Sequence, residues 1–137
     1  MLLLISCERD QPIENIYGTW VVVSYEDYVN NSVIEKNDVD SWNGMDITLK
    51  FMNDSLCGRN TTNSVFAQYT LSDSTIHVIS YGGTMVGQPE WGNMFSDVVY
   101  ELETYKINEN RLSFYYNNNK NSVTLKSKKS SINLCHF

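Results

Sequence analysis

Few residues in this chain have the types and spacing that acid–base or nucleophilic catalysis requires. The two histidines, His77 and His136, are far apart in the sequence, and His77 falls in an alternating segment typical of a strand. A histidine there more often packs or faces solvent than removes a proton from a substrate. The Gly-x-Ser-x-Gly motif of nucleophilic hydrolysis is absent from the sequence. We therefore predict no catalytic residue. An enzyme would need His77 within hydrogen-bond reach of a carboxylate and beside a nucleophile in a cleft.

Metal and cofactor sites have no better support in the sequence. The segment from Asp38 to Trp42 does not fit a calcium-binding loop, because Trp42 occupies a ligand position. No Cys-x-x-Cys pair is present to hold zinc. We predict that the protein uses no metal and no cofactor.

Two of the three cysteines, Cys57 and Cys135, allow two interpretations. They could form a disulfide in an oxidising compartment. Alternatively, Cys57 is a small buried apolar residue and Cys135 belongs to a C-terminal tail. The sequence favours the second interpretation, because two cysteines alone carry no spacing signal.

The third cysteine, Cys7, ends a short apolar run, Met1-Leu2-Leu3-Leu4-Ile5-Ser6-Cys7, and polar residues follow it at once. This order resembles the lipobox of bacterial lipoproteins, in which a small residue precedes a cysteine that receives acyl chains. The resemblance implies lipidation at Cys7 and anchoring to the bacterial outer membrane, where each buried methylene contributes about 0.8 kcal/mol. Glu8 and Asp10 resemble the acidic tether of surface-exported lipoproteins of Bacteroidetes type.

The region before Cys7 is short for a lipoprotein signal peptide. Only six residues precede Cys7 and none of them is basic, whereas a signal peptide has a basic start and an apolar stretch of roughly 7–15 residues. We therefore expect Met1 to be an internal methionine of a longer signal. The alternative is an ordinary N-terminus with a chance cysteine.

Length and charge narrow the class of protein further. The chain has 137 residues, ten Lys or Arg residues and a formal net charge of −6. This length suits one domain, and no run approaches the roughly 20 apolar residues of a membrane-spanning helix. Nucleic-acid binding needs a basic face. The one basic cluster is Lys126, Lys128 and Lys129 near the C-terminus, which we expect to be a solvated end, so we predict no nucleic-acid partner and indifference to polyanions.

The pattern of apolar residues predicts a β-rich α+β domain. Alternating and β-branched segments predict about seven antiparallel strands in a small barrel or sandwich, near 19–25, 47–51, 64–71, 75–81, 105–107, 112–116 and 123–126. Between 89 and 105 the spacing changes to three and four, which predicts one helix packed on the sheet. Residues 29–44 are polar and predict a loop. The expected organisation is a truncated signal and tether at 1–15, the domain at 16–128 and a polar tail at 129–137.

Aromatic residues are the most plausible binding elements. Nine tyrosines and three tryptophans are many for this size, and aromatics on a rim suit apolar ligands, glycans or protein partners. The weak candidates for ligand binding are Trp42, Tyr81, Trp91 and Tyr115. The glycine-containing stretch from Gly82 to Gly92 is a second candidate, as a loop beside Trp91. The alternative is that these aromatics fill space between strands.

From residue 51 onward the chain resembles the META domain family, the HslJ-like heat-shock lipoproteins. The similarity is carried by these motifs in the family's order: Phe51, Asp54, Gly58-Arg59-Asn60 as a turn, Tyr69-Thr70-Leu71, Ile76-His77-Val78, Thr84-Met85, Glu90, Phe95, Tyr105-Lys106-Ile107 and Asn110-Arg111-Leu112. Gly18-Thr19-Trp20 resembles the start of lipocalin-like domains. The chain departs from the family in having no cysteine after Met85, and the resemblance implies a fold and an envelope compartment but no substrate.

Together these observations predict a non-enzymatic lipoprotein of the bacterial cell envelope, with its domain facing the periplasm or the cell surface. Its partners would be the membrane, through the lipid anchor, and a small apolar ligand or an envelope protein. The resemblance adds a role in stress tolerance. The second hypothesis is a protein-interaction or inhibitor module, and an enzyme is the third.

Overall fold

The structure, a computed structural model, describes residues 15–36, 46–129 and 135. In this part of the chain nine strands form one antiparallel sheet, and a single α-helix with a following 3-10 turn lies between β6 and β7. The elements are β1 (Gly18–Asp27), β2 (Ser32–Glu35), β3 (Ile47–Phe51), β4 (Ser55–Asn60), β5 (Asn63–Ser72), β6 (Thr75–Gly83), α1 (Glu90–Val98), η2 (Val99–Glu101), β7 (Thr104–Asn108), β8 (Arg111–Tyr116) and β9 (Asn121–Lys128).

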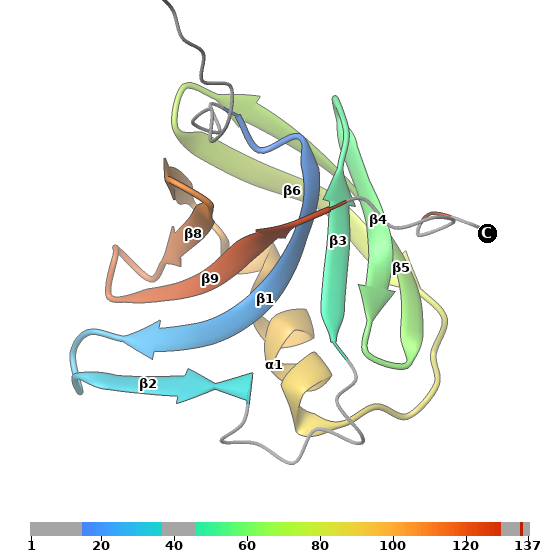
Figure 1. Ribbon diagram of the computed structural model, residues 1–137, viewed down its shortest axis with the longest axis horizontal. Helices are drawn as coiled ribbons and strands as arrows, with labels where there is room; N and C mark the ends of the chain where they lie inside the picture. Colours follow the sequence, from blue (N-terminus) through green and yellow to red (C-terminus); the bar gives the residue numbers. More distant parts are fainter. Residues whose placement is uncertain (1–14, 37–45, 130–134, 136–137) are drawn as a thin grey trace, which may run out of the picture.

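The sheet closes into an uneven barrel because β1 pairs with three neighbours. Its first half pairs with β3, its second half with the short β2, and its whole length with β9. Trp20 lies opposite Leu49 of β3, and Val22 lies opposite Leu125 of β9. A bulge between Val22 and Ser24 bends β1, as bulges do where a strand changes direction around a barrel. Figure 1 shows β1 curving between β3 and β9.

The predicted β-rich class with one helix on an antiparallel sheet is confirmed, although the number of strands was underestimated. The polar range 29–44 was expected to be a loop, but it contains β2, an exposed strand with no buried side to give it alternation. The strand β4 was missed because Gly58-Arg59-Asn60 was taken for a turn. The structure places these three residues inside β4, and the turn follows at Thr61, whose φ is 57°.

The helix is shorter than its apolar spacing predicted. It ends at Val98, η2 continues to Glu101, and Tyr105 belongs to β7. Two adjacent β-branched residues, Val98 and Val99, disfavour helix propagation at this point. Tyr105 and Ile107 still face the core, but they do so with the two-residue period of a strand.

Large side chains fill the interior of the barrel. Trp20, Leu49 and Phe114 are each at most 1% exposed, and α1 adds Trp91 and Phe95, also buried to that extent. The Trp91 ring meets the Tyr25 ring edge to face at a centroid distance of 5.1 Å. The helix therefore closes one end of the barrel from within, as Figure 1 shows.

The barrel is weakest between β6 and β7. These strands are paired at one position, Thr75 with Thr104. Beyond that point η2 connects the two sides, because the Tyr100 hydroxyl accepts a hydrogen bond from the Tyr81 backbone N–H at 2.8 Å. Helical residues thus replace strand pairing along part of the barrel wall.

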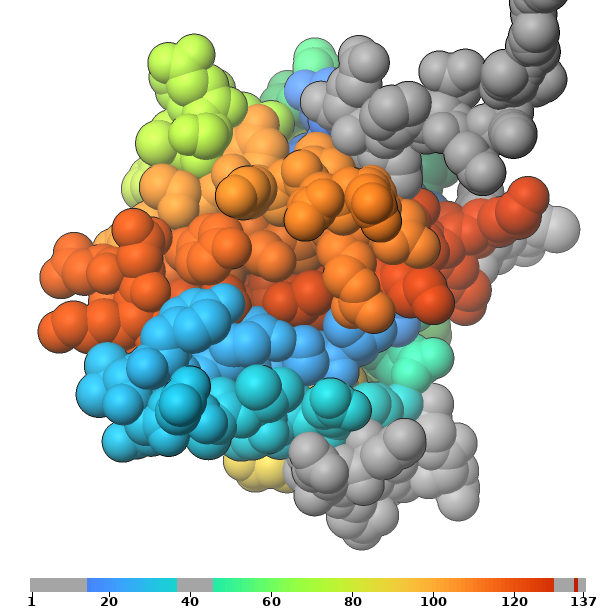
Figure 2. Space-filling view, turned by 60° about the vertical axis from the view of Figure 1, so that its left-hand side comes forward, coloured from blue at the N-terminus to red at the C-terminus, as the bar shows by residue number. Residues whose placement is uncertain are grey.

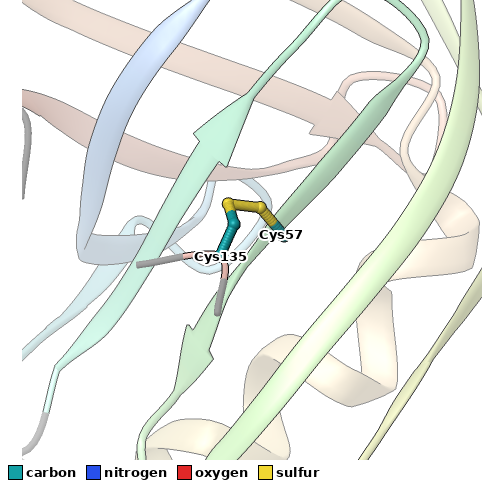
Figure 3. Close-up of a disulfide and its surroundings, with 2 residues drawn as sticks. All are labelled: Cys57 and Cys135. Carbon is teal, nitrogen blue, oxygen red and sulfur yellow. A yellow bond between two sulfur atoms is a disulfide. The ribbon is translucent and has the colours of Figure 1, made fainter. Parts of the chain in front are cut away.

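A disulfide joins Cys57 of β4 to Cys135, which corrects the expectation of two unpaired cysteines. Their Cα atoms are 5.3 Å apart, within the usual range for such a bond, and the two residues are 78 positions apart in the sequence. Cys57 lies between the inward-facing positions Leu56 and Gly58, so its side chain points to the outer side of the sheet. It is nevertheless 1% exposed. Figure 3 shows Cys135 lying over β4, where it covers Cys57.

Candidate functional site

A groove of about 550 Å³ lies where the end of β6, the following segment 84–88 and α1 meet. Amides and hydroxyls supply its polar groups, and none of the described residues that line it is Asp, Glu, Lys, Arg or His. The side chains that give it this character are Asn60, Asn63, Tyr81, Thr84, Gln88, Asn93 and Ser96, with Val65, Met85 and Val86 as apolar neighbours. An uncharged site of this kind can donate and accept hydrogen bonds without a fixed preference for either sign of charge.

The side chain of Asn63, at the start of β5, holds the segment 84–88 in place. Its Oδ1 accepts hydrogen bonds from Thr84 Oγ1 at 2.9 Å and from the Val86 backbone N–H at 2.8 Å. Its Nδ2 donates to the Val86 carbonyl at 2.9 Å and to Gln88 Oε1 at 3.1 Å. The buried amide of Asn63 therefore fixes the segment 84–88, which forms one wall of the groove. A wall held in this way is preorganised for binding.

Asn60, the last residue of β4, joins the groove to the helix. Its Nδ2 lies 3.0 Å from the Tyr81 hydroxyl, 3.1 Å from the Gly92 carbonyl and 2.9 Å from Ser96 Oγ. The residue is 1% exposed, and its Oδ1 has no hydrogen-bond partner among the described residues. A buried carbonyl oxygen without a donor is rare in folded proteins.

Gly92 makes this arrangement possible. A Cβ added at this position would lie 2.6 Å from Thr61 Oγ1, 2.7 Å from Asn60 Oδ1 and 2.8 Å from Gln88 Oε1. These distances are shorter than van der Waals contact. The helix approaches the polar end of β4 closely because it has glycine at this point.

Tyr81 is the aromatic residue of the groove. It is half-buried on β6, and its ring lies 6.1 Å from the ring of Phe95. Burial raises the pKa of Tyr81 above that of free tyrosine, and hydrogen bonds with Asn60 and Ser96 oppose part of this rise. The phenol therefore stays protonated near neutral pH and serves as a hydrogen-bonding group.

The structure does not bring the four predicted ligand-binding aromatics together. Tyr81 lines the groove, and so do Gly82, Gly83 and Gly87 of the glycine-containing stretch. Trp91 lies in the core with no exposed surface, and Tyr115 faces outward on β8 near Thr104 and Lys106. Trp42 and the predicted lipidation site Cys7 are outside the described residues.

The sequence interpretation missed the amides that define the groove. Asn60 was assigned to a turn with Gly58 and Arg59, and Asn63 was not singled out. No local pattern in the sequence marks them, because their role comes from contacts with Val86 and Gly92, more than 20 positions later in the chain.

His77 lies exposed on the outer side of β6, and its ring makes no hydrogen bond or ion pair with any described residue. Within the described ranges no group of three His, Cys, Asp or Glu residues is placed to hold a metal ion. In the same ranges no helix is long and apolar enough to cross a membrane.

A second surface carries exposed apolar residues. The hairpin formed by β1 and β2 presents Tyr28, Val29, Val33 and Ile34, which are 41–68% exposed. The hairpin flanks a shallow hollow between β1, β2 and α1.

Comparison with protein-family models and with curated proteins finds no match. Two solved structures are similar in fold. An NMR structure of a protein from Burkholderia xenovorans has a TM-score of 0.67 and 13% identity, covering 93% of this chain and 100% of that one. A crystal structure of a DUF4847 family protein from Bacteroides vulgatus has a TM-score of 0.61 and 15% identity, covering 85% of this chain and 96% of that one. At these identities the likeness shows the fold alone.

Proposed function

We propose that this protein is a non-enzymatic binding module of the bacterial envelope, anchored through acylated Cys7, and that the groove beside Tyr81 is its ligand site. The observation that carries the proposal is the uncharged, amide-lined groove with a backbone wall fixed by Asn63. The resemblance to META and lipocalin-like lipoproteins supports the envelope address, and with it a part in stress tolerance.

The lining favours a small uncharged ligand that has both hydroxyl groups and an apolar face, as a sugar has. Amides pair with hydroxyls as donors and acceptors at once, while Tyr81, Val65 and Met85 offer apolar contact. A purely apolar ligand inside the barrel has less support, because the centre is filled by side chains such as Trp20, Leu49 and Phe114. We therefore place ligand binding in the groove and not in the barrel.

The test is an NMR titration of the labelled protein with neutral oligosaccharides from bacterial envelope polymers, and with a fatty acid as the competing class. Saccharide binding should shift the amide signals of residues 84–88 and Ser96. Gln88→Ala and Asn93→Ala should weaken binding roughly tenfold each, the value of one good hydrogen bond. Gln68→Ala, on the outer side of β5, should leave it unchanged. Groove shifts produced by the fatty acid and not by any saccharide would contradict the proposed ligand class.

The anchor has its own test. Mass spectrometry of the protein purified from its own membrane should find the mass of acyl chains on Cys7 as the first residue. A mature protein that keeps residues 1–6 and carries no acyl chain would contradict the anchor without affecting the groove.

A protein-interaction module is the second candidate function, because the β1–β2 hairpin exposes four apolar side chains. Photocrosslinking in cells from position 33 should then yield one discrete adduct, whereas position 70 on the outer side of β5 should yield none. The third candidate, an enzyme, has little support, because His77 makes no hydrogen bond to a described carboxylate.

A further inference from the structure

The basic residues of this acidic chain are unevenly distributed. Four strands, β3, β7, β8 and β9, contain five of the ten Lys and Arg residues and no Asp or Glu. We call these five residues the basic face: Lys50, Lys106, Arg111, Lys126 and Lys128. All point to the outer side of the barrel, because they alternate with buried residues such as Leu49, Leu112 and Leu125.

The strand register brings these charges close together. Arg111 of β8 is directly opposite Lys126 of β9. Lys128 is opposite Thr19 of β1, which is in turn opposite Lys50 of β3. Lys106 lies on β7, which pairs with the other edge of β8. Since neighbouring strands are about 4.8 Å apart, the face extends roughly 20 Å around the barrel, centred on β9. Figure 2 shows β8, β9 and β1 side by side on this outer surface.

The basic face has no ion-pair partner within the described structure. None of the five side chains forms an ion pair or a hydrogen bond with a described residue. Like charges directly opposite one another on a sheet, such as Arg111 and Lys126, are destabilising. An arrangement with this cost and no internal counter-charge fits an external anionic partner.

We propose that the basic face docks on an anionic lipid surface, with its lysines and Arg111 contacting headgroup phosphates. Single charges on the outside of a curved sheet match a plane of many phosphates better than one small anion. Arg111, Lys126 and Lys128 lie on the adjacent strands β8 and β9, so these three can face such a plane together. The N-terminal segment also joins the barrel next to the basic face. Gly18 begins β1 beside Phe51, and the next residue, Thr19, lies between Lys128 and Lys50. The anchor proposed at Cys7 would hold this same side against the membrane, so the choice of lipid rests on the proposed envelope address.

The experiment measures binding of the full chain carrying Cys7→Ser, which cannot be acylated, to vesicles. The vesicles are pure phosphatidylcholine or phosphatidylcholine mixed with phosphatidylglycerol. We expect binding only to the anionic vesicles and a steep loss with added salt. A basic residue near such a surface contributes roughly fivefold, so the triple variant R111Q, K126Q and K128Q should bind roughly a hundredfold more weakly.

The matched control removes three charges elsewhere, as K36Q, R59Q and K120Q. It should bind almost as the parent does, and circular dichroism should show both variants folded. Equal losses in the two triple variants would reduce the effect to net charge and overturn the proposal, as would unchanged binding of the first variant. Tighter binding to single-stranded DNA than to the anionic vesicles would overturn the proposal of a lipid partner and would indicate a polyanion. If the protein fails to bind vesicles but still binds saccharide, the proposal for the basic face is overturned and the proposal for the groove stands.

Discussion

Gly92 and Asn60 carry the polar contact between α1 and β4 at the level of single residues. Gly92→Ala places a methyl group within 2.8 Å of three side-chain oxygens, on Thr61, Asn60 and Gln88. Because Thr61 and Asn60 are buried, they have little room to move. We expect the free energy of unfolding to fall by about 1–3 kcal/mol, the usual cost of overpacking, as measured by urea denaturation.

Gly87→Ala is the matched control, because a Cβ at Gly87 meets no atom within 4 Å. Its unfolding midpoint should stay close to that of the parent protein. If Gly92→Ala were as stable as Gly87→Ala, the close approach of α1 to β4 would be contradicted.

Tyr25 makes stability sensitive to alkaline pH. The side chain is 6% exposed, and burial raises the pKa of its phenol well above the ordinary value, with smaller contributions from Tyr116, Tyr81 and Asp97. The folded state therefore keeps a proton that the unfolded chain releases near pH 10. The contribution of Tyr25 is fully present below that pH, and the free energy of unfolding should fall as the pH rises above it.

The measurement is urea unfolding between pH 8 and values above about pH 10. Tyr25→Phe should reduce the alkaline decline, and Tyr17→Phe, at an exposed position, should leave it as it is. The same decline in Tyr25→Phe as in the parent would exclude Tyr25 as one of its sources.

Among the elements, the disulfide has the largest expected effect on stability. It links β4 to a residue 78 positions later, so it closes a long loop and reduces the conformational entropy of the unfolded chain. Reduction should lower the free energy of unfolding by about 2–4 kcal/mol. Urea denaturation with and without reductant checks this. A variant with both Cys57→Ser and Cys135→Ser should not respond to the reductant, and an unchanged midpoint of the parent on reduction would contradict a stabilising bond.

The elements also show where sequence patterns were informative. Strands with one buried side, such as Ile47–Phe51 and Arg111–Tyr116, were predicted because their alternation reflects burial on one face. The exposed Ser32–Glu35 strand has no such signal, since pairing with β1 alone makes it a strand. For α1, the three-and-four spacing found Trp91 and Phe95 but could not separate the helix from Tyr105, which packs partly buried against the core as part of β7.

The candidate site was less predictable than the fold for a related reason. Tyr81 could be selected as an aromatic residue, and it does line the groove. Asn60 and Asn63 have their role because β4 and β5 present them to a segment more than 20 residues later. Such contacts depend on the register of the closed sheet, which local spacing does not encode. Trp91, an equally good candidate by type, is instead buried against Tyr25.

At the scale of the whole molecule, closure depends on β9. This strand pairs with β1 along its length and with β8 on its other side. A chain ending at residue 119 should therefore lose the barrel and give the narrow signal dispersion of an unfolded protein in a two-dimensional NMR spectrum. A chain ending at residue 129 keeps β9 and loses Cys135, so it should fold with reduced stability. A well-dispersed spectrum from the shorter chain would show that β1 does not need β9.

The pairing of the first long strand with the last has a consequence for biosynthesis. A ribosome that has delivered β1 must still make about a hundred residues before its partner emerges, and contacts so distant in sequence fold in milliseconds to seconds instead of microseconds. During that interval the nascent polypeptide is an open thread. Under the proposed envelope location, late closure would keep the chain unfolded, and therefore able to pass a narrow secretion channel, until its last strand has been delivered.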